Sequence, residues 1–367
     1  MRVLVLDEKF QTLGSISLFA SLIWVPRYTK LGYFELHTAT SYFPLLKQGT
    51  YIYRNDRENL GMIDDVQYAQ TDTGSKTCYA KGNFAEALLA DRVISKTLNL
   101  TGKIEDAMRS TVTQFAINPA NNEPVENLIL GESAGLEYQF DAQVTGKNLS
   151  EWLYDVGNTV EISHRVLFDY LNDTLKFEVW QGKDRTDNQE ENSWAIFSNA
   201  FCNIKSVQYE KNTSSYKNYA HVAGEGEGSN RTVIEVDARK ILNGKKEKRR
   251  EIWVDARDLQ RQDSNGNAIS DTAYRALLRN RGVEKLQEYP MIETVNSDID
   301  ANANLIYRKD FDVGDLCTYI NTEIGVETEK RITEIMEVYE GGAETISVTF
   351  GTDEIETVEQ LIKREVN

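Results

Sequence analysis

The sequence predicts a β-rich α+β protein built from several packed domains, and three features indicate this. The chain has 367 residues, enough for two to four compact units at roughly 150 residues each. Most apolar residues alternate with polar ones, which is typical of half-buried strands. Only five prolines occur, and no Pro-rich or Gly/Ser-rich linker separates the segments. The domains are therefore expected to pack on one another.

Residues 1–98 are expected to form a first β unit. Turn residues at 30–32, 47–49 and 72–74 are spaced as in a small barrel or sandwich. They separate six runs that are alternating or rich in aromatic and branched residues: 2–6, 21–28, 33–38, 51–53, 61–66 and 76–82. A helix should follow, with Asn83 as its N-cap and Phe84, Ala87 and Leu88 on one face. This helix is expected to plug or flank the barrel.

Residues 99–198 mix helices and strands. Apolar residues recur at helical spacing over 104–115 and again over 149–156, where Asn148 is a plausible cap and Gly157 ends the run. A hairpin follows at 166–186, near the middle of the chain. Its strands alternate on either side of the Asn172–Asp173 turn. The segment should fold as one small α/β unit.

From residue 199 the strand pattern returns, at 201–209, 219–223, 232–236 and 251–254. A helix is predicted over 271–289, with Pro290 stopping it. Three more strands should follow at 316–320, 330–339 and 345–350. A short last helix is expected at 356–367, in a segment whose apolar stripe is formed by Ile355, Val358, Leu361 and Ile362.

The formal charge is −17, from 58 acidic and 41 basic residues. Nucleic-acid binding proteins usually present a basic face, so this balance disfavours nucleic acid as a ligand. The apolar run of the first ten residues is too short for a signal-peptide core. The longest apolar stretch, 13–25, is shorter than a membrane helix requires. Secretion through a cleaved signal and a transmembrane segment are both unexpected.

Cysteines provide neither a disulfide framework nor a metal motif. Cys78, Cys202 and Cys317 are odd in number and lie more than a hundred residues apart. Three buried or half-buried free thiols are expected.

Two motifs invite a binding interpretation. The glycine-rich run 222–228 resembles a phosphate cradle, but Glu225 and Glu227 stand between its glycines and a strand follows, so a hairpin loop is favoured. Lys245–Arg250 is the single strongly basic cluster. It lacks the interleaved aromatic residues of a nucleic-acid patch, which favours a solvated loop or a docking patch for an acidic protein.

Titratable residues form no recognisable catalytic set. His37, His164 and His221 lie in or beside strands without a metal-binding spacing, and structural roles are expected. Neighbouring carboxylates arise by chance in so acidic a chain, and the loop 263–267 favours a plain turn over a calcium site. These carboxylates are Asp64 with Asp65, Asp255 with Asp258, and Glu190 with Glu191. We predict no catalytic, cofactor-binding or metal-binding residues.

An ordered set of landmarks resembles the tail-hub proteins of long-tailed phages with non-contractile tails. The landmarks extend over nearly the whole chain. They are Trp24–Tyr28, Gly32–Leu36, Gly61–Ile63, Leu88–Ile94, Phe168–Asp169, Gly182–Thr186, Val222–Gly228 with Arg231, Arg249–Leu259, Asp310–Leu316 and Arg331–Tyr339.

Such hubs are similar in fold to the baseplate hubs of contractile tails. The resemblance implies two β-barrel tube domains per subunit and peripheral α/β domains, as in phage baseplate hubs. It places the first tube domain at 1–98, a peripheral α/β domain at 99–198, the second tube domain at 199–240 and 305–355, and an inserted α/β segment at 241–304.

The function implied is structural: a trimeric hub, in the virion, at the distal end of a phage or prophage-derived tail. Expected partners are two further copies, the distal tail or tail tube protein above, and fibre, tip or lysin proteins below. The tape measure protein and passing DNA would occupy the lumen. Two alternatives stay open: a hydrolase of cell-wall glycans or peptides, and a receptor-binding module that uses some of the 36 aromatic residues to bind carbohydrate.

Overall fold

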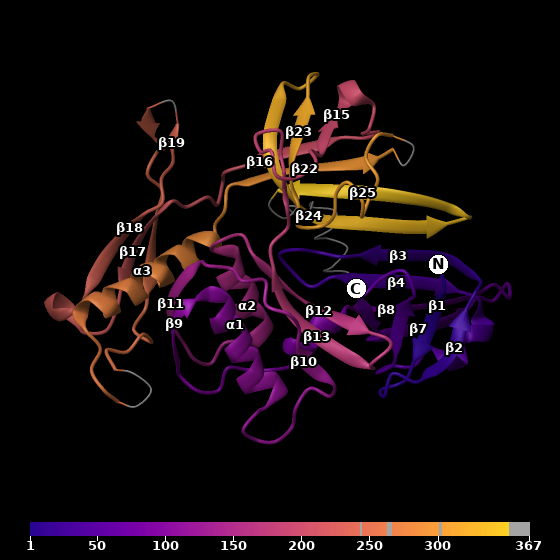
Figure 1. Cartoon of the computed structure of the whole chain (residues 1–367), viewed down its shortest axis with the longest axis horizontal. Coiled ribbons are helices and arrows are strands. Elements are labelled where there is room, and N and C mark those ends of the chain that lie inside the picture. The colour runs from indigo at the N-terminus through magenta and orange to yellow at the C-terminus, as the bar shows by residue number, and fades with distance from the viewer. Residues whose placement is uncertain (243, 263–265, 301–302, 352–367) are drawn as a thin grey trace.

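The computed structural model describes residues 1–242, 244–262, 266–300 and 303–351. The last predicted helix, 356–367, lies outside this range. The described chain is a β-rich α+β protein with several sheets, which confirms the predicted fold class. Figure 1 shows two β units beside each other, with two mixed helix and strand units next to them.

One long antiparallel sheet connects the two β units, and we call it the common sheet. Its main path contains eight strands and passes from the carboxy-terminal half of the chain into the amino-terminal half, where β24 pairs with β3. In order, these strands are β16 (Gln208–Asn212), β22 (Ile292–Ile299), β25 (Ala343–Gly351), β24 (Val326–Glu340), β3 (Phe19–Val25), β4 (Tyr33–Thr38), β8 (Lys76–Asn83) and β7 (Asp65–Gln70).

The first β unit packs a second sheet against β3, β4, β7 and β8. Alternate residues of both sheets, among them Val5, Trp24 and Phe34, meet in a buried core. The second sheet has the order β2 (Thr12–Ile16), β1 (Val3–Leu6), β5 (Tyr51–Arg54) and β6 (Leu60–Met62), and a 3-10 turn, η1 (Thr40–Leu45), lies nearby.

The second β unit has a similar construction. The first half of β24 leaves the common sheet and pairs with β23 (Leu316–Asn321), which also pairs with β14 (Asp184–Arg185) and β15 (Ile196–Ser198). Its core contains Phe197, Tyr319 and Phe350. The short 3-10 turn η4 (Asn199–Phe201) follows β15.

A peripheral α/β unit fills much of 98–180. Helices α1 (Ile104–Val112) and α2 (Leu149–Asn158) share its core with the hairpin of β12 (Ser163–Asp169) and β13 (Thr174–Trp180). The other elements are the π-helical turn η3 (Thr113–Ile117), β9 (Leu98–Lys103), β10 (Leu128–Leu130) and β11 (Gln139–Val144). As predicted, Asn148 caps α2, because its side chain accepts a hydrogen bond from the Glu151 amide at 3.2 Å.

A second peripheral unit lies between β16 and β22. Strands β18 (Val233–Asp237), β17 (Tyr219–Ala223) and β21 (Glu251–Asp255) form a three-stranded sheet, and α3 (Asp271–Gln287) packs against it. A small hairpin, β19 (Ile241–Leu242) with β20 (Lys245–Lys246), projects from this unit (Figure 1), and the turn η5 (Gly228–Asn230) lies in the loop between β17 and β18.

Strand pairing places two segments in other structural units than the predicted domain limits do. Residues 219–237 were expected in the second tube domain, but β17 and β18 pair with β21 and share a core with α3. Strand β22 was expected in the insertion, but it pairs with β16 and β25 of the common sheet. The physical reason is burial: Val222, Val236 and Val254 need the apolar side of α3, whereas Val295 completes the second β core.

The helix predicted after Asn83 is only a 3-10 turn, η2 (Ala85–Leu89). Asn83 does not cap it, because this residue is the last of β8 and pairs with Tyr33. Phe84 is fully buried against Trp24, with ring centroids 4.7 Å apart, which holds the backbone extended at the point where a helix would begin.

Candidate functional site

The seam between the two β units holds a network of buried charged and polar side chains. Backbone pairing aligns β24 with β3, from Glu337 opposite Trp24 to Glu340 opposite Ser21. The pairing extends further, because the Tyr28 amide donates to the Thr333 carbonyl at 2.8 Å. The two β units are therefore parts of one continuous sheet.

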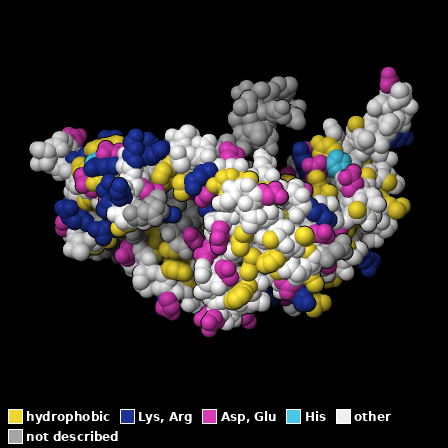
Figure 2. All heavy atoms as spheres, turned by 90° about the horizontal axis from the view of Figure 1, so that it is seen from above, with side chains coloured by type: hydrophobic (Ala, Val, Ile, Leu, Met, Phe, Trp, Pro, Cys, Tyr) yellow, Lys and Arg dark blue, Asp and Glu magenta, His cyan; other side chains and the backbone are white. Residues whose placement is uncertain are grey.

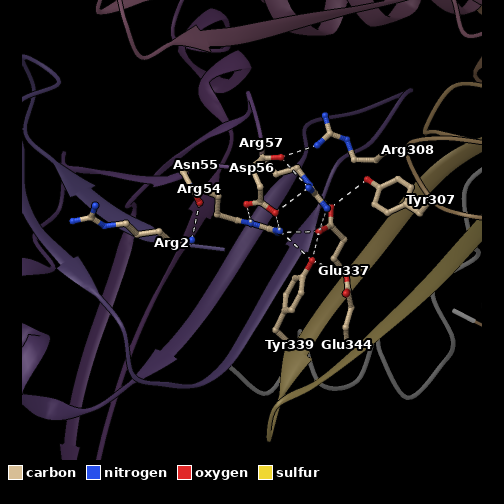
Figure 3. Close-up of polar contacts among 10 residues, drawn as sticks. All are labelled: Arg2, Arg54, Asn55, Asp56, Arg57, Tyr307, Arg308, Glu337, Tyr339 and Glu344. Atoms are coloured by element: carbon tan, nitrogen blue, oxygen red, sulfur yellow. Dashed lines mark hydrogen bonds and ion pairs between the residues drawn. The ribbon is translucent and has the colours of Figure 1, made fainter.

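A buried ionic cluster crosses this seam, and we call it the seam cluster. It contains Arg54, Asp56 and Arg57 from the end of β5 and the loop after it, and Glu337 and Tyr339 from β24 (Figure 3). Arg54 Nη1 donates to Glu337 Oε2 at 2.9 Å and Nη2 donates to Asp56 Oδ2 at 2.9 Å. Arg57 binds Glu337 through two nitrogens, Nη2 at 2.6 Å and Nε at 2.9 Å.

Tyrosines complete the coordination of Glu337. Its carboxylate also accepts hydrogen bonds from the hydroxyls of Tyr339 at 2.8 Å and Tyr307 at 3.2 Å. Arg54 lies over the rings of Trp24 and Tyr339, with its guanidinium carbon 5.2 and 4.8 Å from their centroids. This guanidinium thus contacts two aromatic rings and two carboxylates.

The charges of the cluster are balanced, and its central pair is fully buried, whereas Asp56 is 36% exposed. The side chains of Arg54 and Glu337 have no solvent exposure. Burial alone would raise the pKa of Glu337, but the hydrogen bonds and charges of Arg57 and Arg54 outweigh it and lower that pKa. The carboxylate stays ionised with its acceptor positions occupied, which suits a structural clamp better than proton transfer.

The common sheet has a second side, opposite the two β cores, which we call the free face. Paired residues of adjacent strands point to the same side of a sheet, so the register identifies its members. Carboxylates recur on it, at Glu35, Asp65, Glu210, Asp298, Glu334 and Glu340, all half-buried or exposed. Of the Lys and Arg residues in these eight strands, only Lys81 lies on the same side within the common sheet. Arg27, which follows β3, also lies on this side and pairs with Glu334 at 2.5 Å, so the free face has more carboxylates than cations and is acidic.

The glycine-rich run forms the loop between antiparallel β17 and β18, as predicted. Arg231 closes the loop by donating from Nε to the Gly224 carbonyl at 2.8 Å. The basic cluster Lys245–Arg250 covers β20 and the segment leading to β21, where Lys245, Lys246 and Lys248 are exposed.

The three histidines lie far apart in the fold. His37 contacts Glu35 at 2.5 Å, and His221 lies 3.3 Å from Glu251. The ring of His164 is buried, and its two nitrogens have no hydrogen-bond partner among the described residues; burial lowers its pKa to about 3, so it is neutral. The described residues bring no three His, Cys, Asp or Glu side chains into a group that could hold a metal ion.

The carboxylates noted in the sequence are separated by their own partners. Asp65 pairs with Lys81, Asp255 with Arg231 and Arg257, and Asp258 with Arg281. Glu190 and Glu191 are exposed, and residues 263–265 of the calcium-like loop lie outside the described range.

Cysteine burial was predicted correctly for two residues and wrongly for one. Cys78 and Cys317 are buried free thiols, but Cys202 is exposed. It follows the turn η4 in a left-handed conformation, and this places it at the surface. In the described part of the chain, the helices are too short or too polar to cross a membrane.

Solved structures with this fold are phage and prophage tail proteins. A tail protein from Neisseria meningitidis MC58 is 13% identical, with 96% of each chain covered and a TM-score of 0.57. The 43 kDa tail protein of prophage MuSo2 from Shewanella oneidensis is 12% identical, with 95% and 98% covered and a TM-score of 0.57. Prophage tail protein gp18 from Listeria monocytogenes EGD-e is 11% identical, with 100% and 99% covered and a TM-score of 0.55. The chain therefore shares the fold of these tail proteins.

The family match is more specific. Residues 2–352 match the model of the Siphovirus ReqiPepy6 Gp37-like proteins, and the chain belongs to this family. Comparison with curated protein sequences gives no match. The expected likeness to tail proteins of phages with non-contractile tails is confirmed.

Proposed function

We propose that the protein is a structural component of the virion, a trimeric hub at the distal end of the tail that joins the tail tube to the tip and encloses the DNA channel. The observation that carries this proposal is the common sheet. It combines two similar β units in one subunit and ends in two strands, β7 and β16, that pair with no further strand of the described residues at their outer edges.

Free edges offer a physical route to a ring. An edge strand presents unpaired N–H and C=O groups that can pair with another chain. If β7 of one copy pairs with β16 of the next, three copies close a ring that contains six β units. Such a ring matches the six-fold symmetry expected of a tail tube, because the two β units of each copy occupy equivalent places.

The free face would then line the channel. Its recurring carboxylates repel the phosphates of DNA, which allows a duplex to pass without being held. The hub would contact the distal tail or tail tube protein on one side and fibre, tip or lysin proteins on the other. The tape measure protein, and later the DNA, would pass through the lumen.

The proposal assigns the chain no catalytic step, because its family and fold point to tail structure and the buried Glu337 serves as a clamp. Wall hydrolysis and carbohydrate binding are outcomes that the tests can reveal. Clearing in a zymogram that is lost on changing one carboxylate would favour a hydrolase. Specific binding on a glycan array would favour a receptor module.

The decisive experiment measures the mass of the purified protein by mass photometry and images it in negative stain. A trimeric ring is the expected result, and a monomer that never enters tail particles would refute the hub. Proline variants of the β7 edge sharpen the test. Gln67→Pro and Tyr68→Pro are made separately, because one of the two amides is expected to point away from β8.

One of the two edge variants should lose trimers without unfolding. The matched control is Leu13→Pro in β2, which is an edge strand of the other sheet of the first β unit. This control should keep the trimer, as judged by the same mass measurement. Equal loss of trimers in the control would show that the β7 edge has no special role.

A further inference from the structure

Charge is unevenly distributed between the two peripheral units. Residues 213–290 contain 15 Lys and Arg against 12 Asp and Glu, whereas residues 98–180 contain 5 against 13. Figure 2 shows Lys and Arg gathered at the end of the molecule that holds β17, β18 and α3. The protein is thus strongly acidic overall but has one basic end.

The sheet of this basic unit is covered on only one side by α3. Val222 and Val254, which are paired across β17 and β21, face the helix. Their neighbours along each strand, such as His221 and Trp253, face the opposite side of the sheet. There Trp253 is 61% exposed and Val233 is 42% exposed. Glu235, Asp237, Glu251 and Asp255 lie on the same side, and Arg239, Arg249 and Arg231 pair with the last three, so this open side of β17, β18 and β21 combines exposed apolar side chains with paired charges.

Arginines stack on the aromatic residues of this open side. The Arg249 guanidinium lies 3.6 Å from the centroid of the Tyr219 ring, and Arg231 lies 5.8 Å from Trp253. The Arg249 side chain is held by Glu251 at 2.5 Å. Trp, Tyr and Arg are the residues enriched at the energetic centres of protein interfaces, and here they are already fixed in position.

The β19–β20 hairpin extends this surface. Lys240, Lys245 and Lys248 are exposed, and Ile241 is 68% exposed. Glu247 lies beside Lys240 and accepts a hydrogen bond from its backbone amide at 3.1 Å. We name the open side and the hairpin together the basic clasp. It contains Lys240, Ile241, Lys245, Lys248, Arg249, Tyr219, Arg231, Val233 and Trp253.

The connections of the basic unit place it beside a free edge. The chain leaves β16 at Asn212 to enter the unit and returns at Ile292 to begin β22. Strand β16 is the end of the common sheet that, in the proposed ring, meets the next copy. The basic clasp is therefore anchored where a neighbouring subunit would arrive.

We infer that the basic clasp binds the acidic peripheral unit, residues 98–180, of the neighbouring copy in the ring. This inference rests on the proposed trimer. It is supported by charge complementarity between the exposed lysines and stacked arginines of one unit and a surplus of eight acidic residues on the other. A contact between different patches of identical chains is heterologous, and three such contacts close a ring.

The first test measures the trimer dissociation constant by mass photometry at low and high salt. Reversing Lys240, Lys245 and Lys248 together to Glu should weaken the trimer about tenfold or more and remove most of its salt dependence. The matched control, Lys9→Glu with Lys47→Glu and Lys96→Glu, makes the same change of net charge at exposed positions outside the clasp and should leave the constant unchanged.

Trp253→Ala tests the apolar part of the clasp separately. Loss of a central Trp at an interface typically weakens binding by roughly thirtyfold. The exposed position of Trp253 means that the monomer should keep its fold, which circular dichroism checks.

Zero-length carbodiimide cross-linking identifies the partner surface. A mixture of unlabelled and ¹⁵N-labelled protein is cross-linked as trimer, and mixed-label peptides should join Lys240, Lys245 or Lys248 to carboxylates within 98–180. Links from these lysines only within one copy, or only to carboxylates outside 98–180 of the neighbour, would overturn the inference.

The outcomes separate the inference from the proposed function. A stable trimer that is indifferent to all clasp variants would refute the clasp and leave the hub intact. A protein that stays monomeric under every condition and never enters tail particles would refute both.

Discussion

Replacing Glu337 with Gln should destabilise the seam between the two β units by about 3–5 kcal/mol, the usual cost of removing one partner from a buried ion pair. The carboxylate accepts hydrogen bonds from Arg54, Arg57, Tyr307 and Tyr339. Gln keeps one acceptor oxygen and turns an NH2 group toward these donors. It also leaves the fully buried Arg54 guanidinium without the charge that compensates it.

Hydrogen exchange at the seam measures this loss locally, which avoids the assumption that a multidomain chain unfolds in one step. Peptides covering 21–24 and 337–340 should exchange about a hundredfold faster or more in the variant, since each 1.4 kcal/mol is a factor of ten. Glu137→Gln is the matched control. It breaks an ion pair with Lys103, but the two side chains are 74% and 42% exposed, so protection should change little.

A double-mutant cycle tests whether charge compensation is the cause. Arg54→Met combined with Glu337→Gln removes one charge of each sign, and Arg57 can still pair with Asp56 at 3.0 Å. The double variant should therefore be more stable than the sum of the single effects predicts, by roughly 2 kcal/mol. Additive effects, or a single Glu337→Gln variant that exchanges at the wild-type rate, would refute the reasoning.

Three further predictions concern burial and capping. Burial raises the pKa of Glu86 to about 7, so the stability that its protonated form contributes at low pH is lost as pH rises through that value. The Glu86→Gln variant should therefore gain about 3 kcal/mol in free energy of unfolding relative to the wild type between pH 5 and pH 8, measured by urea unfolding. Burial lowers the pKa of His164 to about 3, so stability is full above pH 6.5 and falls toward pH 3; His164→Phe should flatten the acid limb of the same titration by up to about 5 kcal/mol. Asn148→Ala should cost about 1–2 kcal/mol, because it removes the cap on α2 and the hydrogen bond from Asn148 Nδ2 to the Ala90 carbonyl, and the free energy of unfolding in urea measures the loss. Asn148→Asp keeps the acceptor for Glu151 but sets a carboxylate against that carbonyl, so it should not restore wild-type stability.

Local pattern was sufficient to predict most strands and all three α-helices. The hairpin strands alternate because one of their sides is buried. Val166 and Phe168 lie in the core, opposite Phe177 and Leu175. The end of helix α3 could be predicted because Pro290 follows it closely.

Pairing between distant strands could not be predicted in the same way. Nothing in the sequence of 219–223 indicates that its parallel partner is 251–255 rather than a strand of the second β unit. The choice depends on which apolar surface is available to cover each strand, and α3 supplies that surface only after the intervening segments have folded. Local propensity carries no information of this kind.

The sequence carries one weak indication of the seam cluster, an arginine on the buried side of a strand. Arg54 occupies the same side of β5 as Ile52, so the alternation of 51–54 places a charge on the buried side. A charge at such a position requires a partner. Its partner Glu337 is 283 residues away, and only the fold brings the two together.

The seam explains why a tail hub would keep charge in such a place. An apolar contact between two β units tolerates small sliding movements, whereas bidentate and stacked arginine contacts fix both angle and register. In the proposed ring, the free edges of β7 and β16 lie on opposite sides of this seam, so any rotation there displaces one edge relative to the other. A ring closes only when that relation is the same in every copy. The buried ions of the seam would therefore fix the angle between the two β units within one subunit. The basic clasp would fix the position of one subunit relative to the next.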